Sequence, residues 1–353
     1  MIYNFACYPP RLGQLSIFIS MHNYAAIIKK HEIILLLAIL SILFTFSSCS
    51  DDNNSPDCCA YMEDAEGKIA YGYFVEISQI PRCTYNEKAA SDYLAEFART
   101  LGFEFFQDDI FNLIVRKNGS EGRENELPIV LQAHIDMVCA KDDDSPHDFE
   151  TDPIIPVIID GNWVRASGRT TLGADNGSGL AMIMAILASE SISHPPIEAL
   201  FTVQEEIGLV GALAFDVSEL NGTRLINLDN VQEKVLIAGS KLDDGPEIII
   251  PILPKALAKI ASLPDWNYKE ESPLRDKMIE VFKKVYGGEA PIIARINNNI
   301  AGVEPMAFAE RLPHFDMISI GPTLHDIHTP NERMNLPSFY RVHNYLVKVL
   351  DEL

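Results

Sequence analysis

Cysteine is scarce in this sequence, and no two cysteines have the spacing of a metal-ligand pair. The six cysteines form no CxxC motif and no Cys/His zinc pattern, which argues against a sulfur-bound metal. A disulfide from Cys58 or Cys59 would fit an oxidising compartment, whereas Cys83 and Cys139 are predicted to be small buried hydrophobic residues. Nitrogen and oxygen are therefore the ligand atoms to look for.

Positive charge is the second deficit. Lys and Arg number 28 against 50 Asp and Glu, giving a formal net charge of -22. Such a surface repels nucleic acid and anionic lipid headgroups, so we expect no nucleic-acid partner. Most of the carboxylates should be solvated surface groups, but carboxylates also supply oxygen ligands for divalent cations. With 353 residues, 47% of them hydrophobic, the chain can bury one large core or two modest ones.

The apolar run near the N-terminus is too short for a comfortable transmembrane helix. Residues 33–46 follow the basic pair at 29–30, which is the layout of a secretory signal that could equally start at Met21. Residues 46–49 resemble a bacterial lipoprotein signal, in which Cys49 becomes the lipidated first residue. We therefore predict a signal peptide at 1–48, a flexible tether at 49–60 and a lipoprotein anchored in the cell envelope. The alternatives are an uncleaved membrane anchor and, if this N-terminus is misassigned, a cytoplasmic protein.

One acidic residue lies in a cluster of small residues at positions 170–179. Asp175 has Gly173, Gly177 and Gly179 as neighbours, and glycine lets the backbone turn sharply and lets another group approach it. The apolar run at 180–188 predicts a buried helix packed against a sheet. Asp175 should therefore lie deep, as a functional carboxylate or as the N-cap of that helix.

Several predicted strands end in ionisable residues. Strands are expected at 112–116, 129–133, 199–203, 224–228 and 316–320. Helices between them indicate an α/β fold with βαβ units and a mostly parallel sheet, in which ligands bind beyond the carboxyl ends of the strands. The polar residues at or beyond these ends are His134, Asp136, Glu205, Glu206, Asp229 and His328.

Three further helices have recognisable termini. Thr84 and Glu87 are spaced as a capping box. Ser272 precedes a proline at the start of a second helix, which the glycines at 287–288 should end. The last helix is expected from Ser338.

Two imidazoles and three carboxylates make a ligand set suited to zinc, manganese or cobalt. The five candidate metal ligands are His134, Asp175, Glu206, Asp229 and His328. A single catalytic metal needs about three protein ligands, so five groups predict two metals bridged by Asp175, which can hold a hydroxide between them. Glu205 would then act as general base and Asp136 would orient His134. Each residue alone has a plainer reading as a structural or solvated group, so the prediction depends on their conjunction.

The segments that carry these residues resemble the aminoacyl-histidine dipeptidase family of di-zinc exopeptidases. They lie at 131–138, 170–179, 202–206, 226–229 and 319–328. The resemblance implies a three-layer α/β/α catalytic domain, hydrolysis of Xaa-His and similar dipeptides, and the same five ligands with Glu205 as base. It also implies a cis peptide bond between Asp175 and Asn176.

The sequence departs from that family in two places. The catalytic domain would comprise 61–239 and 264–353, but only a short connection at 240–263 stands where the family has a lid and dimerisation domain, which is too few residues for a domain. Ile300 stands near a family histidine, and losing an oxyanion donor can lower turnover by about 10²–10³-fold. A non-catalytic, metal- or peptide-binding lipoprotein is therefore the alternative to a peptidase. The side chains that the substrate pocket prefers, the physiological metal and the oligomeric state stay open.

Overall fold

The computed structural model describes residues 65–241, 265–297 and 303–353. The chain divides into two units, 1–54 and 55–353, and every described residue belongs to the second. The predictions for the signal at 1–48, the lipidated Cys49, the tether at 49–60 and Ile300 lie outside the described residues. So does nearly all of the short connection at 240–263.

The centre of the molecule is an eight-stranded sheet of order β1-β2-β6-β3-β7-β10-β8-β9. Its strands are β1 (Glu104–Gln107), β2 (Leu113–Lys117), β3 (Ile129–His134), β6 (Ile197–Thr202), β7 (Arg224–Asn227), β8 (Val235–Lys241), β9 (Ile292–Asn297) and β10 (Asp316–Ser319). The inner strands β6, β3, β7 and β10 are parallel, while β1, β2 and β8 supply the antiparallel pairs. The predicted strands and mostly parallel sheet are confirmed.

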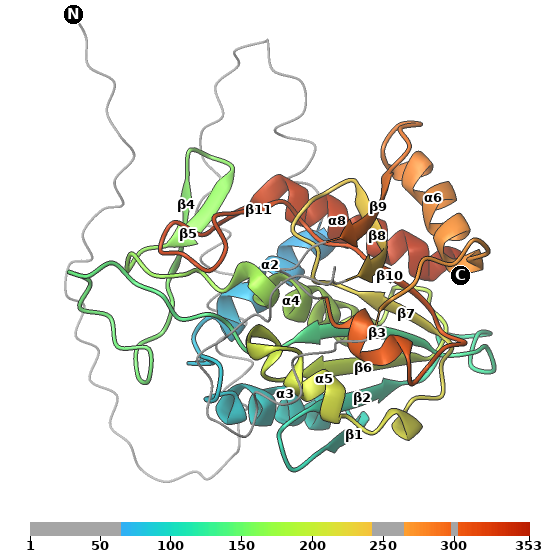
Figure 1. Ribbon diagram of the computed structural model, residues 1–353, viewed down its shortest axis with the longest axis horizontal. Helices are drawn as coiled ribbons and strands as arrows, with labels where there is room; N and C mark the ends of the chain where they lie inside the picture. Colours follow the sequence, from blue (N-terminus) through green and yellow to red (C-terminus); the bar gives the residue numbers. More distant parts are fainter. Residues whose placement is uncertain (1–64, 242–264, 298–302) are drawn as a thin grey trace, which may run out of the picture. The chain divides into compact units, whose positions relative to one another are not determined.

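The inner strands are apolar on both faces because each face is covered by helices (Figure 1). One face packs into a core with α2 (Ala65–Ile77), α3 (Lys88–Thr100), α4 (Ala174–Ala188), α6 (Pro273–Val285) and α8 (Leu336–Glu352). The other face packs against α5 (Val210–Ala214) and α7 (Pro305–Ala309). Two helical layers around a sheet give the predicted three-layer α/β/α architecture.

The helix patterns were largely right about burial. Almost all of α4 is buried, as its continuous apolar run predicts. In α6, the Ser272 hydroxyl accepts from the Arg275 amide at 3.1 Å, and Pro273 occupies the first turn. The apolar stripe of α8 faces the core, although α8 begins at Leu336, with Asn335 rather than a serine as N-cap.

The capping box predicted at Thr84 and Glu87 is wrong. The helix begins later, at Lys88, and no side chain caps it. The Thr84 hydroxyl instead donates to Asp136 Oδ2 at 2.9 Å, and Glu87 Oε1 accepts from the Tyr85 amide at 2.8 Å. The Thr84 hydroxyl thus bonds to a residue distant in sequence, Asp136, and not to the backbone amide that a capping box would use.

A second, smaller sheet stands apart from the first and has the order β11-β12-β5-β4. It comprises β4 (Pro156–Ile159), β5 (Trp163–Ala166), β11 (Leu324–His325) and β12 (Arg333–Asn335). Strands β11 and β12 are antiparallel, with Leu324 opposite Met334. Residues 326–332 form the hairpin loop that connects these two strands.

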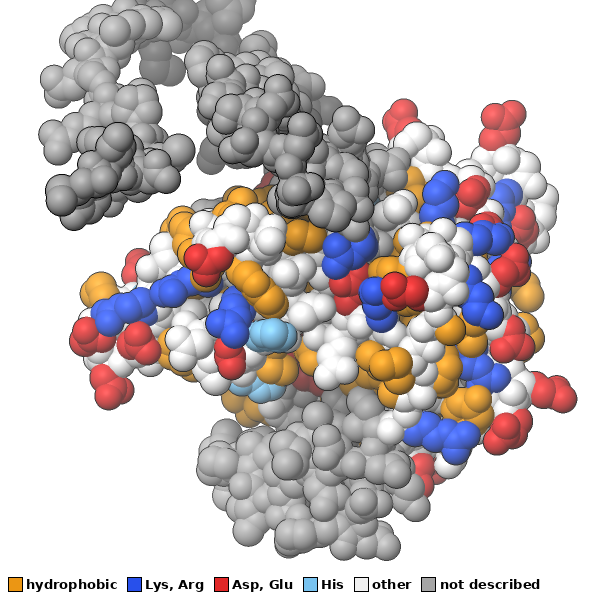
Figure 2. Space-filling view, turned by 90° about the horizontal axis from the view of Figure 1, so that it is seen from above, with side chains coloured by type: hydrophobic (Ala, Val, Ile, Leu, Met, Phe, Trp, Pro, Cys, Tyr) orange, Lys and Arg blue, Asp and Glu red, His pale blue; other side chains and the backbone are white. Residues whose placement is uncertain are grey.

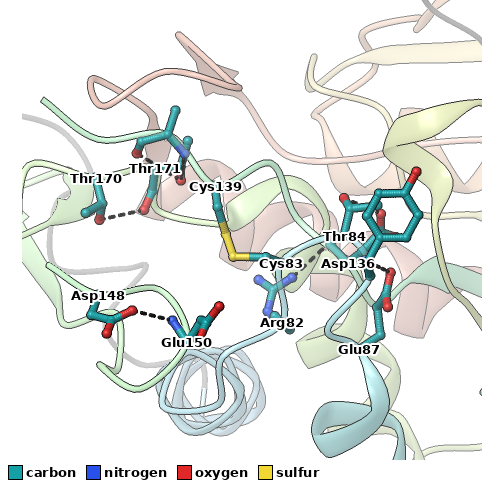
Figure 3. The surroundings of a disulfide bond; sticks show 12 residues. Arg82, Cys83, Thr84, Glu87, Asp136, Cys139, Asp148, Glu150, Thr170 and Thr171 are labelled. Carbon is teal, nitrogen blue, oxygen red and sulfur yellow. Dashed lines mark hydrogen bonds between the residues drawn. A yellow bond between two sulfur atoms is a disulfide. The ribbon is translucent and has the colours of Figure 1, made fainter. Parts of the chain in front are cut away.

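Cys83 and Cys139 form a disulfide, with their Cα atoms 5.6 Å apart, which corrects the prediction that both are free buried residues (Figure 3). The segment after α2 runs beside the segment after β3, where Cys83 pairs with Met137 in an isolated parallel bridge. That bridge brings the two cysteines together across a sequence separation of 56 residues. No local sequence signal marks such a pairing.

Removing this disulfide should destabilise the fold. In the chain-entropy model, cross-linking a loop of this length lowers the entropy of the unfolded chain. That loss raises the free energy of the unfolded state by about 4 kcal/mol. We expect a Cys83→Ala/Cys139→Ala variant to lower the free energy of unfolding by about 2–5 kcal/mol, measured by urea denaturation without reductant. Wild type denatured with reductant should match the variant, and equal midpoints for oxidised wild type and variant would contradict the cross-link.

The surface carries charge of both signs. On the face in Figure 2, acidic and basic side chains alternate and no continuous basic patch is visible. None of the helices within the described residues has the length and apolar character needed to cross a bilayer.

Candidate metal centre

Parallel pairing brings the ends of four strands to one edge of the large sheet. His134 ends β3 opposite Thr202 of β6, and Gln132 pairs with Asn227 of β7. Ser319 of β10 also pairs with Asn227. The segments that leave these strands carry Glu205 and Glu206 after β6, Asp229 after β7 and His328 after β10. The predicted site residues therefore meet at the carboxyl edge.

Asp175 is the point of contact between the two imidazoles. Its Oδ1 lies 3.1 Å from His134 Nε2, and its Oδ2 lies 3.2 Å from His328 Nε2. His134 Nε2 also lies 3.5 Å from Asp229 Oδ1. His328 Nε2 lies 3.0 Å from Glu206 Oε2. All five candidate ligands thus form one chain of contacts with Asp175 in the middle.

The backbone around Asp175 has the form that the family resemblance implies. The peptide bond between Asp175 and Asn176 is cis, and both residues have non-helical dihedral angles inside α4. Gly173, in a left-handed conformation with φ of 69°, occupies the N-cap position. Asp175 is therefore not the N-cap of α4, which was the alternative reading of this residue.

Asp136 contacts both a candidate ligand and the segment of the candidate base. Its Oδ1 lies 3.4 Å from His134 Nδ1 and accepts from the Glu205 amide at 3.0 Å. Its Oδ2 accepts from the Thr84 hydroxyl at 2.9 Å and from the Glu206 amide at 3.4 Å. Asp136 is fully buried, so these contacts fix His134 and the short 3₁₀ helix η2 (Glu205–Ile207) relative to each other.

The electrostatics of the cluster show a surplus of buried negative charge. Burial, reinforced by the charge of Asp175, raises the pKa of Asp229 to about 8. Burial also raises the pKa of Glu205 well above its ordinary value. Hydrogen bonds to Asp175 and Glu206 raise the pKa of His328 to about 10. With these raised pKa values, the carboxyl and imidazole groups hold protons that offset the negative charge. A bound divalent cation could supply the positive charge in place of those protons.

The donor set fits a divalent metal. Ligand atoms of His134, Asp175 and Glu206 all lie within 4.8 Å of one another. The second oxygen of Glu206, Oε1, is buried and has no hydrogen-bond partner among the described residues. A buried carboxylate oxygen without a partner is costly in a protein interior, and a cation would satisfy it.

Two buried charged residues next to these ligands were missed in the sequence. Arg82 donates to the carbonyl oxygens of Ile135 and Gly173, at 2.8 and 2.5 Å. Glu332 accepts from the amides of Gly173 and Asp175, at 2.9 and 3.2 Å. Neither residue lies just beyond the carboxyl end of a predicted strand, so the rule that found the ligands could not find them.

Glu304 is a third buried acid that the sequence did not single out. It is fully buried at the N-cap of α7, and burial raises its pKa to about 7. Gln132 donates to its Oε2, and Gln132 also accepts from Asn227 at 2.7 Å. Gln132 lies two residues before His134 on β3, so the side chains of both residues face the same side of the sheet.

The comparisons with known proteins converge on peptidases. The model of peptidase family M20/M25/M40 matches residues 130–352. The cytosol non-specific dipeptidase of Escherichia coli is 44% identical over 166 residues, which are 47% of this chain and 34% of that protein. The matched segment therefore spans only about a third of the length of that curated relative.

Solved structures show the same fold. An aminoacylhistidine dipeptidase from Vibrio alginolyticus superposes with a TM-score of 0.71 at 21% identity, covering 83% of this chain and 99% of that one. A dinuclear metal binding peptidase from Bacillus subtilis superposes with a TM-score of 0.51 at 11% identity, covering 82% and 100%.

Proposed function

Because this chain belongs to peptidase family M20/M25/M40, whose model matches residues 130–352, we propose that it hydrolyses dipeptides with bound divalent metal ions. The observation that carries the proposal is the contact of Asp175 with both His134 and His328. His134 ends a strand of the large sheet and His328 lies in a loop of the small sheet, so two separate parts of the fold bring an imidazole to one buried carboxylate.

We propose that five side chains hold two cations. His134 and Asp229 lie on one side of Asp175, and His328 with Glu206 lies on the other, so Asp175 would be shared. Zinc suits this nitrogen and oxygen set, with manganese and cobalt as alternatives. When bound, the cations would polarise the scissile carbonyl and lower the pKa of water. The dinuclear peptidase of Bacillus subtilis supports the count of two.

Glu205 is the residue we assign to proton transfer. Its elevated pKa suits a group that must accept a proton from water and then give it to the leaving amine. Its backbone is held by the Asp136 carboxylate, which also faces the ring of His134. Asp136 therefore couples the position of the base to that of a metal ligand.

We propose short peptides, and dipeptides with a C-terminal histidine among them, as the substrates. The support is the 44% identity with the cytosol non-specific dipeptidase, together with the fold shared with the aminoacylhistidine dipeptidase.

We also propose that the catalytic domain comprises residues 61–239 and 264–353 and is tethered to the cell envelope through Cys49. The Cys83–Cys139 disulfide supports an exported protein, because structural disulfides persist in oxidising compartments. The alternative, a cytoplasmic protein, would keep these thiols reduced. Labelling cells with a lipid precursor and comparing wild type with Cys49→Ser distinguishes the two.

Metal depletion and dipeptide hydrolysis test the proposal together. We expect purified protein to bind close to two zinc or manganese ions per chain and to cleave Xaa-His dipeptides. Chelation should lower the rate at least about 10²-fold, because the cations supply several kcal/mol of transition-state stabilisation. Re-addition of metal should restore it.

A metal-binding protein without catalysis is the second candidate. Its support is the short stretch between the end of β8 at Lys241 and the start of α6 at Pro273, which replaces a large inserted domain in the family that the sequence resembles. Protein that binds two cations and cleaves no dipeptide would establish this alternative.

A further inference from the structure

Three of the five proposed ligands, His134, Asp175 and His328, lie in segments that are far apart in the chain. His134 and Asp136 lie at the end of β3, Asp175 lies at the start of α4, and His328 lies in the hairpin loop between β11 and β12. Hydrogen bonds from residues outside the ligand set can hold these segments at fixed separations.

We propose that Arg82 and Glu332 are positioning residues that join these three segments and thereby set the geometry of the metal ligands. The inference rests on the proposed metal-dependent function and adds two residues that touch neither metal nor substrate. Arg82 lies beside the disulfide, close to the Asp136 segment (Figure 3).

Arg82 joins the first segment to the second. Its Nη1 donates to the carbonyl oxygens of Ile135 and Asp136, at 2.8 and 3.2 Å, and its Nη2 donates to that of Gly173 at 2.5 Å. These carbonyls lie within two residues of His134 on one side and of Asp175 on the other. The planar guanidinium can serve two segments at once, which a lysine ammonium cannot do with the same geometry.

The glycines of the Asp175 loop make room for this guanidinium. A Cβ atom on Gly173 would lie 2.6 Å from Arg82 Nη2, and one on Gly177 would lie 2.7 Å from it. Both distances are shorter than any real contact of a Cβ atom. The small residues around Asp175 thus accommodate a buried cation of the protein itself.

Glu332 joins the second segment to the third. Its Oε2 accepts from the amides of Leu172 and Gly173, at 2.7 and 2.9 Å, and its Oε1 accepts from the amide of Asp175 at 3.2 Å. Glu332 lies in the same hairpin loop as His328, so these bonds dock that loop on the segment of Asp175. Arg82 and Glu332 are only 1% and 2% exposed. Both oxygens of Glu332 and both terminal nitrogens of Arg82 have hydrogen-bond partners, while Arg82 Nε has none among the described residues.

The experiment measures metal binding directly. Arg82→Met, Arg82→Lys and Glu332→Gln are compared with wild type, using zinc affinity from chelator competition and the electronic spectrum of the cobalt-substituted protein. We expect Arg82→Met to weaken zinc about 10–100-fold, the range seen when groups that orient metal ligands are removed. The cobalt bands should shift, and Arg82→Lys should recover part of the affinity.

Arg275→Met is the matched control. Arg275 is also buried and also donates to two backbone carbonyls, those of Lys269 and Glu270, but it holds the start of α6 instead of a ligand loop. The Arg275→Met variant should have a lower Tm than wild type but the same zinc affinity and the same cobalt bands. If Arg82→Met fails to fold, Arg82→Lys and Glu332→Gln carry the comparison.

The outcomes separate the two proposals. Variants of Arg82 and Glu332 that bind zinc as tightly as wild type, with unchanged cobalt bands, overturn the positioning role and leave the proposed function intact. Wild-type protein that binds no metal overturns the proposed function and the positioning role together.

Discussion

Glu205→Gln is expected to lower kcat for dipeptide hydrolysis by about 10²–10⁴-fold, the usual contribution of a general base. The amide keeps the size of the side chain but cannot accept the proton from water. KM and metal content should stay near wild type, because Glu205 is not among the five proposed ligands. Steady-state kinetics with metal analysis of the same sample measures both.

The control for this variant is Glu190→Gln, which removes an exposed carboxylate after α4. It should retain wild-type kcat, so any loss in Glu205→Gln would not arise from net charge. A Glu205→Gln enzyme within about 3-fold of wild type would show that another group moves the proton, since loss of a base costs at least about 10²-fold.

Asp175→Asn should abolish tight metal binding altogether. Asp175 touches both imidazoles, so both cations depend on its charge if it is shared. Wild type at a metal concentration of 100 Kd should gain about 2.7 kcal/mol of stability from binding. Asp175→Asn should show no metal-dependent rise in Tm and less than about one bound ion per chain, because an amide is a weaker ligand than a carboxylate.

Asp276→Asn is the control for Asp175→Asn, since Asp276 is exposed in the first turn of α6. It should retain the metal-dependent rise in Tm. Binding of one ion with near wild-type affinity by Asp175→Asn would instead indicate that Asp175 serves a single metal and is not shared.

The ligands could be predicted because they obey a rule of sheet topology. Parallel strands place their carboxyl ends at one edge, so His134, the glutamates at 205–206 and Asp229 could be assigned to one site before any coordinates. His328 was assigned to the same site because it follows the strand predicted at 316–320. The structure places it in the hairpin loop of the smaller sheet, which the sequence did not predict.

Other contacts could not be predicted because they depend on pairs of segments that meet only in the folded chain. Arg82 follows no periodic pattern. It donates to backbone carbonyls, and because every residue has one, the sequence does not show which carbonyls are its partners. Cys83 and Cys139 become partners only because two loops run side by side. Thr84 fits a local capping motif, but in the folded chain its hydroxyl donates to the Asp136 carboxylate instead.

The hairpin between β11 and β12 has a consequence for biosynthesis. It supplies the ligand His328 and the positioning residue Glu332, and the other four proposed ligands all precede it in the chain. A nascent chain from which this hairpin has not yet emerged therefore lacks one of the five proposed ligands, His328. We expect full cation uptake to follow the emergence of this hairpin from the ribosome.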